Sequence, residues 1–143
     1  MSRVKPWAVI FDWDGVLVDS SALHEASWEQ LAAEEGFSLP EDYFKRGFGM
    51  KNDEIIPHLL GWTRQAGEIR RLSGRKAALY RQLMAQRGLA LLPGASALLV
   101  RLHAASVPCA VASSTPRENI AAVLDQFCLS TAFGAIIAAE DVA

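Results

Sequence analysis

The chain has 143 residues, of which 51% are hydrophobic and 21% are charged, and its formal net charge at pH 7 is -2. This is the composition of a globular domain with a sizeable core, which excludes a disordered chain. The small net charge provides no general attraction to nucleic acid or to an anionic membrane surface. Any anion-binding chemistry must therefore be local.

Neither targeting segments nor cysteine motifs are evident. The amino-terminal stretch MSRVKPW lacks the apolar core of a signal peptide. No apolar run approaches the ~18 residues that a membrane span needs. The two cysteines, Cys109 and Cys128, lack metal-binding spacing, so we expect two reduced, packed thiols in a cytoplasmic protein, with a disulfide between them as the alternative.

The first predicted element is a strand over residues 7–11, WAVIF, a short apolar run of the kind that is covered on both faces of a sheet. A helical pattern then begins at Ser20 or Ser21, either of which can occupy the cap position, and it ends at Gly36.

Helices dominate the next part of the chain. A turn-rich aromatic segment leads to a second helix, which Asn52 or Asp53 can cap and in which Pro57 is tolerated or forms a kink. A third helix is predicted over residues 67–86, closed by Gly88. Residues 20–88 are therefore predicted to be helical throughout.

Beyond Pro93 the pattern alternates between helix and strand. Residues 95–105 and 120–127 are amphipathic, whereas residues 107–113 and 134–139 are apolar runs with strand character. Such alternation predicts a parallel sheet with right-handed crossovers. The expected fold class is α/β, a Rossmann-like core formed by residues 1–18 and 90–143, with an all-helical domain of residues 19–89 inserted into it.

Two carboxylates, Asp12 and Asp14, directly follow the first predicted strand. In open parallel sheets, reactive groups collect at the carboxyl ends of the strands. Two carboxylates about 4 Å apart repel each other by roughly 4 kcal/mol at an effective dielectric of about 20, so the pair needs a shared proton or a cation. Oxygen ligands of this kind suit Mg²⁺, which also gathers substrate phosphate.

The segment DWDGVL, residues 12–17, resembles the first signature of the haloacid dehalogenase superfamily, whose phosphotransferases work through an aspartyl phosphate. Residues 19–36 and 47–61 resemble the helical cap of the subgroup that contains β-phosphoglucomutase and the phosphoglycolate phosphatases. The segment VASSTPRENI, residues 111–120, resembles the second signature. The similarity covers nearly the whole chain.

The resemblance implies roles for residues of both signatures. Asp12 would be the nucleophile and a ligand of Mg²⁺. Asp14 would be the general acid and base, and its backbone carbonyl would also bind Mg²⁺. Ser113 would bind a phosphate oxygen, helped by the backbone N–H of Ser114, and Gly15 would belong to the same phosphate-binding loop system.

Three cap residues, His24, Trp28 and Lys76, are further candidates for substrate contact. His24 and Trp28 lie four residues apart on one helical face, where ordinary packing between helices is the alternative. Lys76 falls where the subgroup places a cap lysine, although most basic residues of this helix are expected to face water.

The expected activity is hydrolysis of a small phosphorylated metabolite by a Mg²⁺-dependent phosphatase. A halide leaves without protonation, so the presence of Asp14 weighs against true dehalogenation. Two alternatives stay open, namely a sugar-phosphate mutase of the β-phosphoglucomutase type and a catalytically inactive phosphate-binding or interaction module.

The family pattern continues with a lysine and an acidic strand end for which the chain has no counterpart, since Asp141 falls too early to be that metal ligand. We therefore expect residues 1–143 alone to be weakly active or inactive. Residues 7–11 would also form an exposed sheet edge. A fragment of a longer enzyme, or a homodimer that covers this edge, would account for it.

Overall fold

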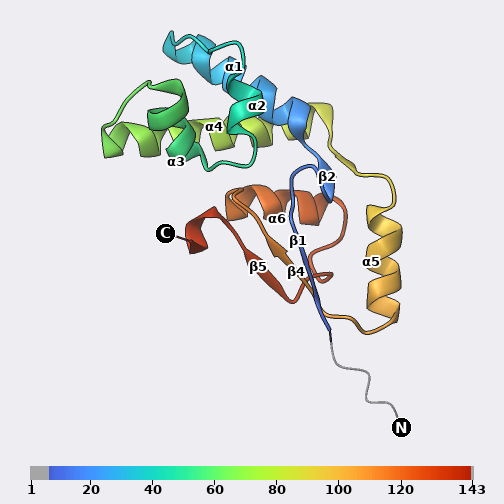
Figure 1. The fold of residues 1–143 in the computed structure, drawn as a ribbon. Helices are drawn as coiled ribbons and strands as arrows, with labels where there is room; N and C mark the ends of the chain where they lie inside the picture. Colours follow the sequence, from blue (N-terminus) through green and yellow to red (C-terminus); the bar gives the residue numbers. More distant parts are fainter. Residues whose placement is uncertain (1–6, 143) are drawn as a thin grey trace. The chain divides into compact units, whose positions relative to one another are not determined.

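A computed structural model describes residues 7–142. Most of the MSRVKPW stretch, residues 1–6, lies outside the described residues, as does Ala143. The chain divides into two compact units. The α/β unit contains the residues up to Asp19 and those from Ala90 onward, and the helical unit contains Ser20–Leu89. Figure 1 labels the helices and strands of both units.

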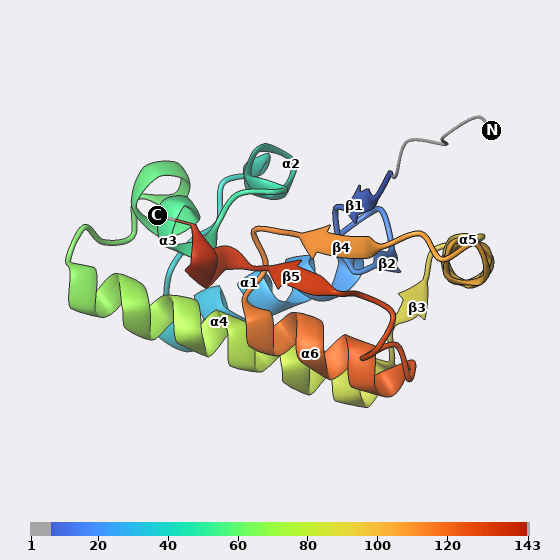
Figure 2. The same ribbon diagram turned by 90° about the horizontal axis from the view of Figure 1, so that it is seen from below.

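The α/β unit is built on a parallel sheet. Strands β1 (Val9–Phe11), β4 (Cys109–Ala112) and β5 (Ala135–Ile137) lie in the order β1-β4-β5. Helix α5 (Ala95–Ala104) precedes β4, and α6 (Arg117–Gln126) connects β4 to β5. Figure 2 shows α6 running along one face of β4 and β5. The predicted α/β class and the parallel sheet are confirmed.

The two faces of this sheet differ in burial. Phe11 pairs with Val111, and these side chains are 7% and 0% exposed. The preceding residue of β1, Ile10, points to the other face because side chains alternate along a strand, and it is 72% exposed. The expectation that the first strand is covered on both faces is therefore wrong within the described chain.

A short antiparallel ribbon marks the points where the chain leaves and re-enters the α/β unit. Strand β2 (Val18–Asp19) pairs with β3 (Ala90–Leu91). The N–H of Leu92 extends the pairing by donating to the carbonyl of Leu17 at 2.9 Å. Two-residue strands carry too little periodicity to be predicted from sequence.

The helical unit is built on two long helices. Helix α1 (Ser21–Glu35) has Ser20 at its cap position and ends at Gly36, whose φ of 72° is left-handed. Helix α4 (Ala66–Arg87) is followed by Gly88. Both predicted helices are confirmed to within a residue at each end.

The segment between these helices is more helical than its turn-rich sequence indicates. It contains α2 (Tyr43–Gly47), α3 (Asn52–Glu54) and a π-helical turn, η1 (Ile55–Leu60). The predicted second helix is thus present, with Lys51 rather than Asn52 or Asp53 at the cap position. Pro57 lies within η1 and cannot donate a backbone hydrogen bond, which favours a departure from α-helical geometry.

The core of the helical unit is aliphatic and aromatic. Its buried members are Trp28, Leu31, Tyr43, Ile55, Ile56, Leu72 and Leu79. Among residues 7–142, no helix combines the length and the apolar character needed to cross a bilayer.

Candidate active site in the α/β unit

The loop after β1 is held by the carbonyl of Trp13. This oxygen accepts backbone N–H bonds from Val16, Leu17 and Val18 at 3.0 to 3.3 Å. The indole of Trp13 is 1% exposed, so it anchors the loop in the core. The tight turn requires a left-handed residue, and Gly15 supplies it with φ of 75°.

The anchored loop places Asp12 and Asp14 at the carboxyl end of β1. Asp12 follows the last strand residue and is exposed, and its Oδ1 accepts the N–H of Trp13 at 2.7 Å. Asp14 is half-buried. The first of these carboxylates is therefore accessible, whereas the second is partly enclosed.

The second signature lies at the same end of the sheet, after β4. The Ser113 N–H donates to the carbonyl of Ile137 at 2.9 Å, which extends the pairing of β4 with β5. The Ser113 Oγ accepts the Thr115 N–H at 3.1 Å. Ser113 and Ser114 are half-buried. Because β1 and β4 are parallel neighbours, the loops that carry Asp12 and Ser113 emerge side by side.

A side-chain hydrogen bond joins the two loops. The hydroxyl of Thr115 donates to Oδ2 of Asp14. Thr115 is 5% exposed. No role for the Thr115 hydroxyl was predicted from the sequence. Its position two residues after Ser113 in the second signature is the only signal that the sequence offers.

The oxygens of Asp12 and Asp14 are hard donors of the kind that Mg²⁺ prefers, so this donor set fits the predicted cation in its chemistry. No group of three or more His, Cys, Asp or Glu side chains with metal-binding geometry occurs within residues 7–142. Asp141 is engaged elsewhere, since it accepts the Ala138 N–H at 2.7 Å and pairs with Arg117. That N–H, and then the Arg117 charge, hold the pKa of Asp141 below its ordinary value.

The three candidates for substrate contact in the helical unit lie together. Lys76 Nζ is 2.7 Å from His24 Nδ1 and 5.3 Å from the centre of the Trp28 ring. The His24 ring stacks on Tyr80 with a centroid separation of 4.3 Å. Lys76 is 3% exposed, so it does not face water as most basic residues of α4 were expected to do.

Trp28 has a packing role in this cluster. It belongs to the core of the helical unit, is 3% exposed, and meets Trp62 edge-on at 5.9 Å. Packing between helices, the alternative left open by the sequence, is thus present at Trp28. Contact between substrate and His24, Trp28 or Lys76 stays a prediction.

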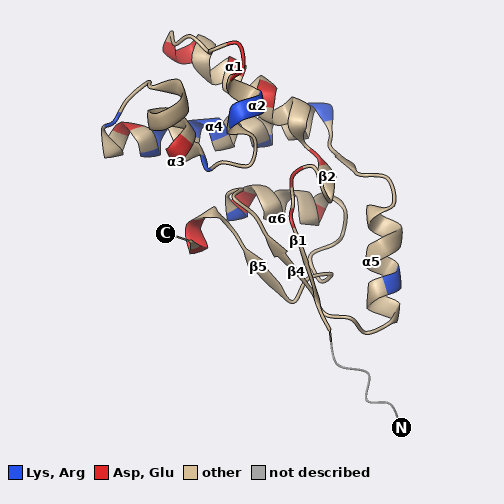
Figure 3. Cartoon of the chain, in the orientation of Figure 1, with Lys and Arg blue, Asp and Glu red and all other residues tan. Residues whose placement is uncertain are grey.

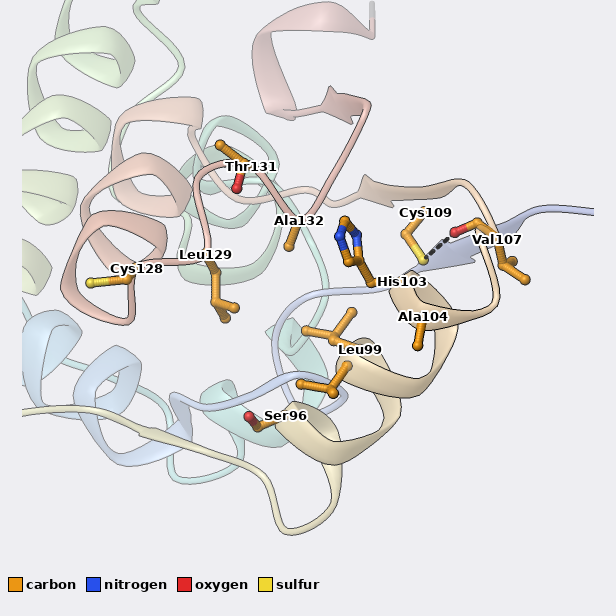
Figure 4. A pocket seen from close by; sticks show the side chains of 11 residues that line it. Ser96, Leu99, His103, Ala104, Val107, Cys109, Cys128, Leu129, Thr131 and Ala132 are labelled. Atoms are coloured by element: carbon orange, nitrogen blue, oxygen red, sulfur yellow. Dashed lines mark hydrogen bonds between the residues drawn. The ribbon is translucent and has the colours of Figure 1, made fainter.

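A separate pocket of about 340 Å³ lies in the α/β unit (Figure 4). Its lining includes Leu99, His103, Cys109 and Cys128. Cys109 begins β4, so this pocket lies at the opposite end of the strand from Ser113. Both cysteines are free thiols, as expected, but Cys128 is exposed, so the expectation that it packs is wrong.

The residues of this site fall within a match to a known protein family. The family model described as haloacid dehalogenase-like hydrolase matches residues 9–143. This range includes both loops of the site.

Individual proteins show the same similarity. The chain is 35% identical over 136 residues to the chloroplastic 5-amino-6-(5-phospho-D-ribitylamino)uracil phosphatase of Arabidopsis thaliana, covering 93% of this chain and 36% of that protein. It is 29% identical to β-phosphoglucomutase of Bacillus subtilis, covering 91% and 59%.

Among solved structures, a mutant of CbbY from Rhodobacter sphaeroides in complex with xylulose-(1,5)bisphosphate superposes with a TM-score of 0.84 at 26% identity. The superposition covers 95% of this chain and 64% of CbbY. The chain thus spans between about a third and two thirds of the length of these proteins.

Proposed function

Because the chain belongs to the haloacid dehalogenase-like hydrolase family, we propose that its α/β unit carries the catalytic site of a phosphatase for a small phosphorylated metabolite. The observation that carries this proposal is the convergence of Asp12, Asp14 and Ser113 at the carboxyl ends of two neighbouring parallel strands. Phosphatases among the relatives support the reaction class.

The proposed reaction has two steps. A carboxylate oxygen of Asp12 attacks phosphorus, the bond from phosphorus to the leaving oxygen breaks, and protonated Asp14 gives its proton to that oxygen. Asp14 then takes a proton from water as the water oxygen attacks phosphorus. The bond between Asp12 and phosphorus breaks, which releases inorganic phosphate and restores both carboxyl groups.

Other residues of the site bind and orient the phosphoryl group. Ser113 and the Ser114 N–H would contact its oxygens, and Gly15 would allow the loop to approach closely. The carboxylate of Asp12 and the backbone carbonyl of Asp14 would hold Mg²⁺, which supplies positive charge against the transferring phosphoryl group when it is bound.

The test is hydrolysis of p-nitrophenyl phosphate with Mg²⁺. Residues 1–143 alone are expected to be weakly active, and Asp12→Asn should abolish this activity, because the nucleophile is lost. Asp19→Asn removes a nearby exposed carboxylate that lies outside the site, and it should leave the rate unchanged. Equal rates for wild type and Asp12→Asn would reject the nucleophile assignment.

A mutase is the second candidate, favoured by the similarity to β-phosphoglucomutase. It would use the same residues but would admit a second sugar hydroxyl in place of water. Product analysis separates the two reactions, since a phosphatase releases inorganic phosphate and a mutase yields an isomeric sugar phosphate.

Further proposals concern the rest of the chain. The helical domain, predicted over residues 19–89, would serve as a cap that contacts substrate through His24, Trp28 and Lys76. The protein would act in the cytoplasm, which two free thiols favour. It would form a homodimer that covers the edge of β1, which is favoured by the position of β1 at the edge of the described sheet.

A further inference from the structure

We infer that Thr115 is a positioning residue, whose hydroxyl fixes the orientation of the Asp14 carboxylate from which protons are transferred. This inference rests on the proposed function for the role of Asp14. The observation that carries it is the hydrogen bond from Thr115 Oγ1 to Asp14 Oδ2, which spans the two loops of the site.

The Thr115 backbone is fixed from both directions. Its N–H donates to Ser113 Oγ at 3.1 Å, and its carbonyl accepts the N–H of Ala139 at 3.1 Å. Pro116 follows and occupies the cap position of α6. A residue before proline is restricted to extended conformations, so Thr115 has little backbone freedom.

The Thr115 side chain is equally constrained. β-Branched residues have few accessible χ1 rotamers, and this side chain is 5% exposed. The position of its hydroxyl is therefore fixed by the fold. The backbone of Asp14 is held by the Trp13 turn, and the bond to Thr115 acts on the remaining freedom, which is the rotation of the Asp14 side chain about χ1.

This arrangement separates the proposed roles of the two carboxylates. Asp12 accepts the N–H of its own neighbour Trp13 within one loop, whereas Asp14 is tied to the loop that carries the phosphate-binding Ser113. A proton donor must lie within hydrogen-bond reach of the leaving oxygen, and a misplacement of about 1 Å can cost about 100-fold in rate. Thr115 would keep the Asp14 carboxylate within hydrogen-bond reach of the leaving oxygen of the bound phosphoryl group.

The first test measures the Asp14 rotamer in the full 143-residue chain, from NMR three-bond couplings to its side-chain carboxyl carbon. Wild type and Thr115→Ser, which keeps the hydroxyl, should show a single rotamer. Thr115→Val keeps the shape but removes the hydroxyl, and it should show rotamer averaging. A single unchanged rotamer in Thr115→Val, or averaging in wild type, would overturn the inference.

The second test compares leaving groups. Nitrophenolate leaves without protonation, whereas an alkoxide needs a proton from Asp14. Thr115→Val should therefore lower kcat/KM for an alkyl phosphate about 10-fold more than for p-nitrophenyl phosphate, and Thr115→Ser should restore it. Equal losses on both substrates would indicate a merely structural role and would contradict the inference.

Thr131→Val is the matched control, because Thr131 is an exposed threonine of the same unit and should affect neither measurement. The two proposals fail in different ways. Hydrolysis that persists in Asp12→Asn would reject the phosphatase mechanism, while the coupling measurement would still decide whether Thr115 orients Asp14.

Discussion

At the scale of single residues, the site depends on one backbone position, Gly15. Its φ of 75° lets the chain turn directly after Asp14, so that the Gly15 N–H donates to the carbonyl of Val18 at 2.9 Å. A side chain in this left-handed conformation costs about 1–2 kcal/mol. The geometry of Asp14 is thus coupled to a glycine that has no side chain to contact a ligand.

Gly15→Ala should therefore lower the free energy of unfolding by about 1 kcal/mol, and it should reduce hydrolysis by displacing Asp14. Gly74→Ala is the matched control. Gly74 lies inside α4, and an added Cβ would meet nothing within 4 Å, so this change should stabilise by about 0.5–1 kcal/mol. Thermal melts of both variants give the comparison, and equal effects would refute the role of the Gly15 turn.

At the scale of elements, the two long helices of the helical unit are joined by ion pairs. The Arg71 guanidinium makes a bidentate contact with the Glu35 carboxylate, with both N–O distances 2.7 Å. The Arg75 guanidinium contacts the Glu34 carboxylate in the same way, with N–O distances of 2.8 and 2.9 Å. Figure 3 shows basic residues along α4 and acidic residues on α1. Hydrogen bonds from Arg75 and Arg71 lower the pKa values of Glu34 and Glu35, respectively, below the ordinary value of 4.5.

The lowered pKa values set the direction of a pH effect. A carboxyl whose pKa is lower in the folded than in the unfolded protein stabilises the fold above pH 4.5, where it is ionised in both states. This stabilisation is lost as the pH falls through the pKa of the folded state. Arg71→Met with Arg75→Met should therefore lower Tm at pH 7 and have a smaller effect in acid. Exposed Arg70→Met on the same helix is the control; a Tm deficit that is the same at both pH values would contradict the prediction.

Periodicity and cap residues were sufficient to predict the long elements. Helical patterns and terminal glycines located α1 and α4, and the alternation after Pro93 predicted the parallel sheet. The short ribbon of β2 and β3, the helix α2 and the exposure of Ile10 could not be predicted, because each depends on contacts between distant segments.

In the candidate site, too, the residues of local motifs could be predicted and a contact between distant segments could not. Asp12, Asp14 and Ser113 could be proposed because each lies in a local signature. Thr115 could not, because its bond to Asp14 joins residues 101 positions apart in the chain. A threonine that precedes a proline at the start of a helix is equally typical of a residue that only begins the helix.

At the scale of the whole molecule, β1 is an edge strand of the described sheet, and its Ile10 side chain is 72% exposed. An apolar edge strand favours pairing with another chain. Light scattering should give the mass of a dimer for wild type and of a monomer for Ile10→Glu. Val100→Glu, a change at another exposed apolar residue, is the control and should remain dimeric. A monomeric wild type would refute the dimer proposal.

The central claim is that Asp12 accepts the phosphoryl group, and the most direct test is to locate that group on the chain. The protein is incubated with p-nitrophenyl phosphate and Mg²⁺, quenched in acid and examined by mass spectrometry. The account predicts one added phosphoryl group on the peptide that contains Asp12, and no such adduct in Asp12→Asn. Turnover without an adduct on this peptide, or an adduct that persists in Asp12→Asn, would contradict it.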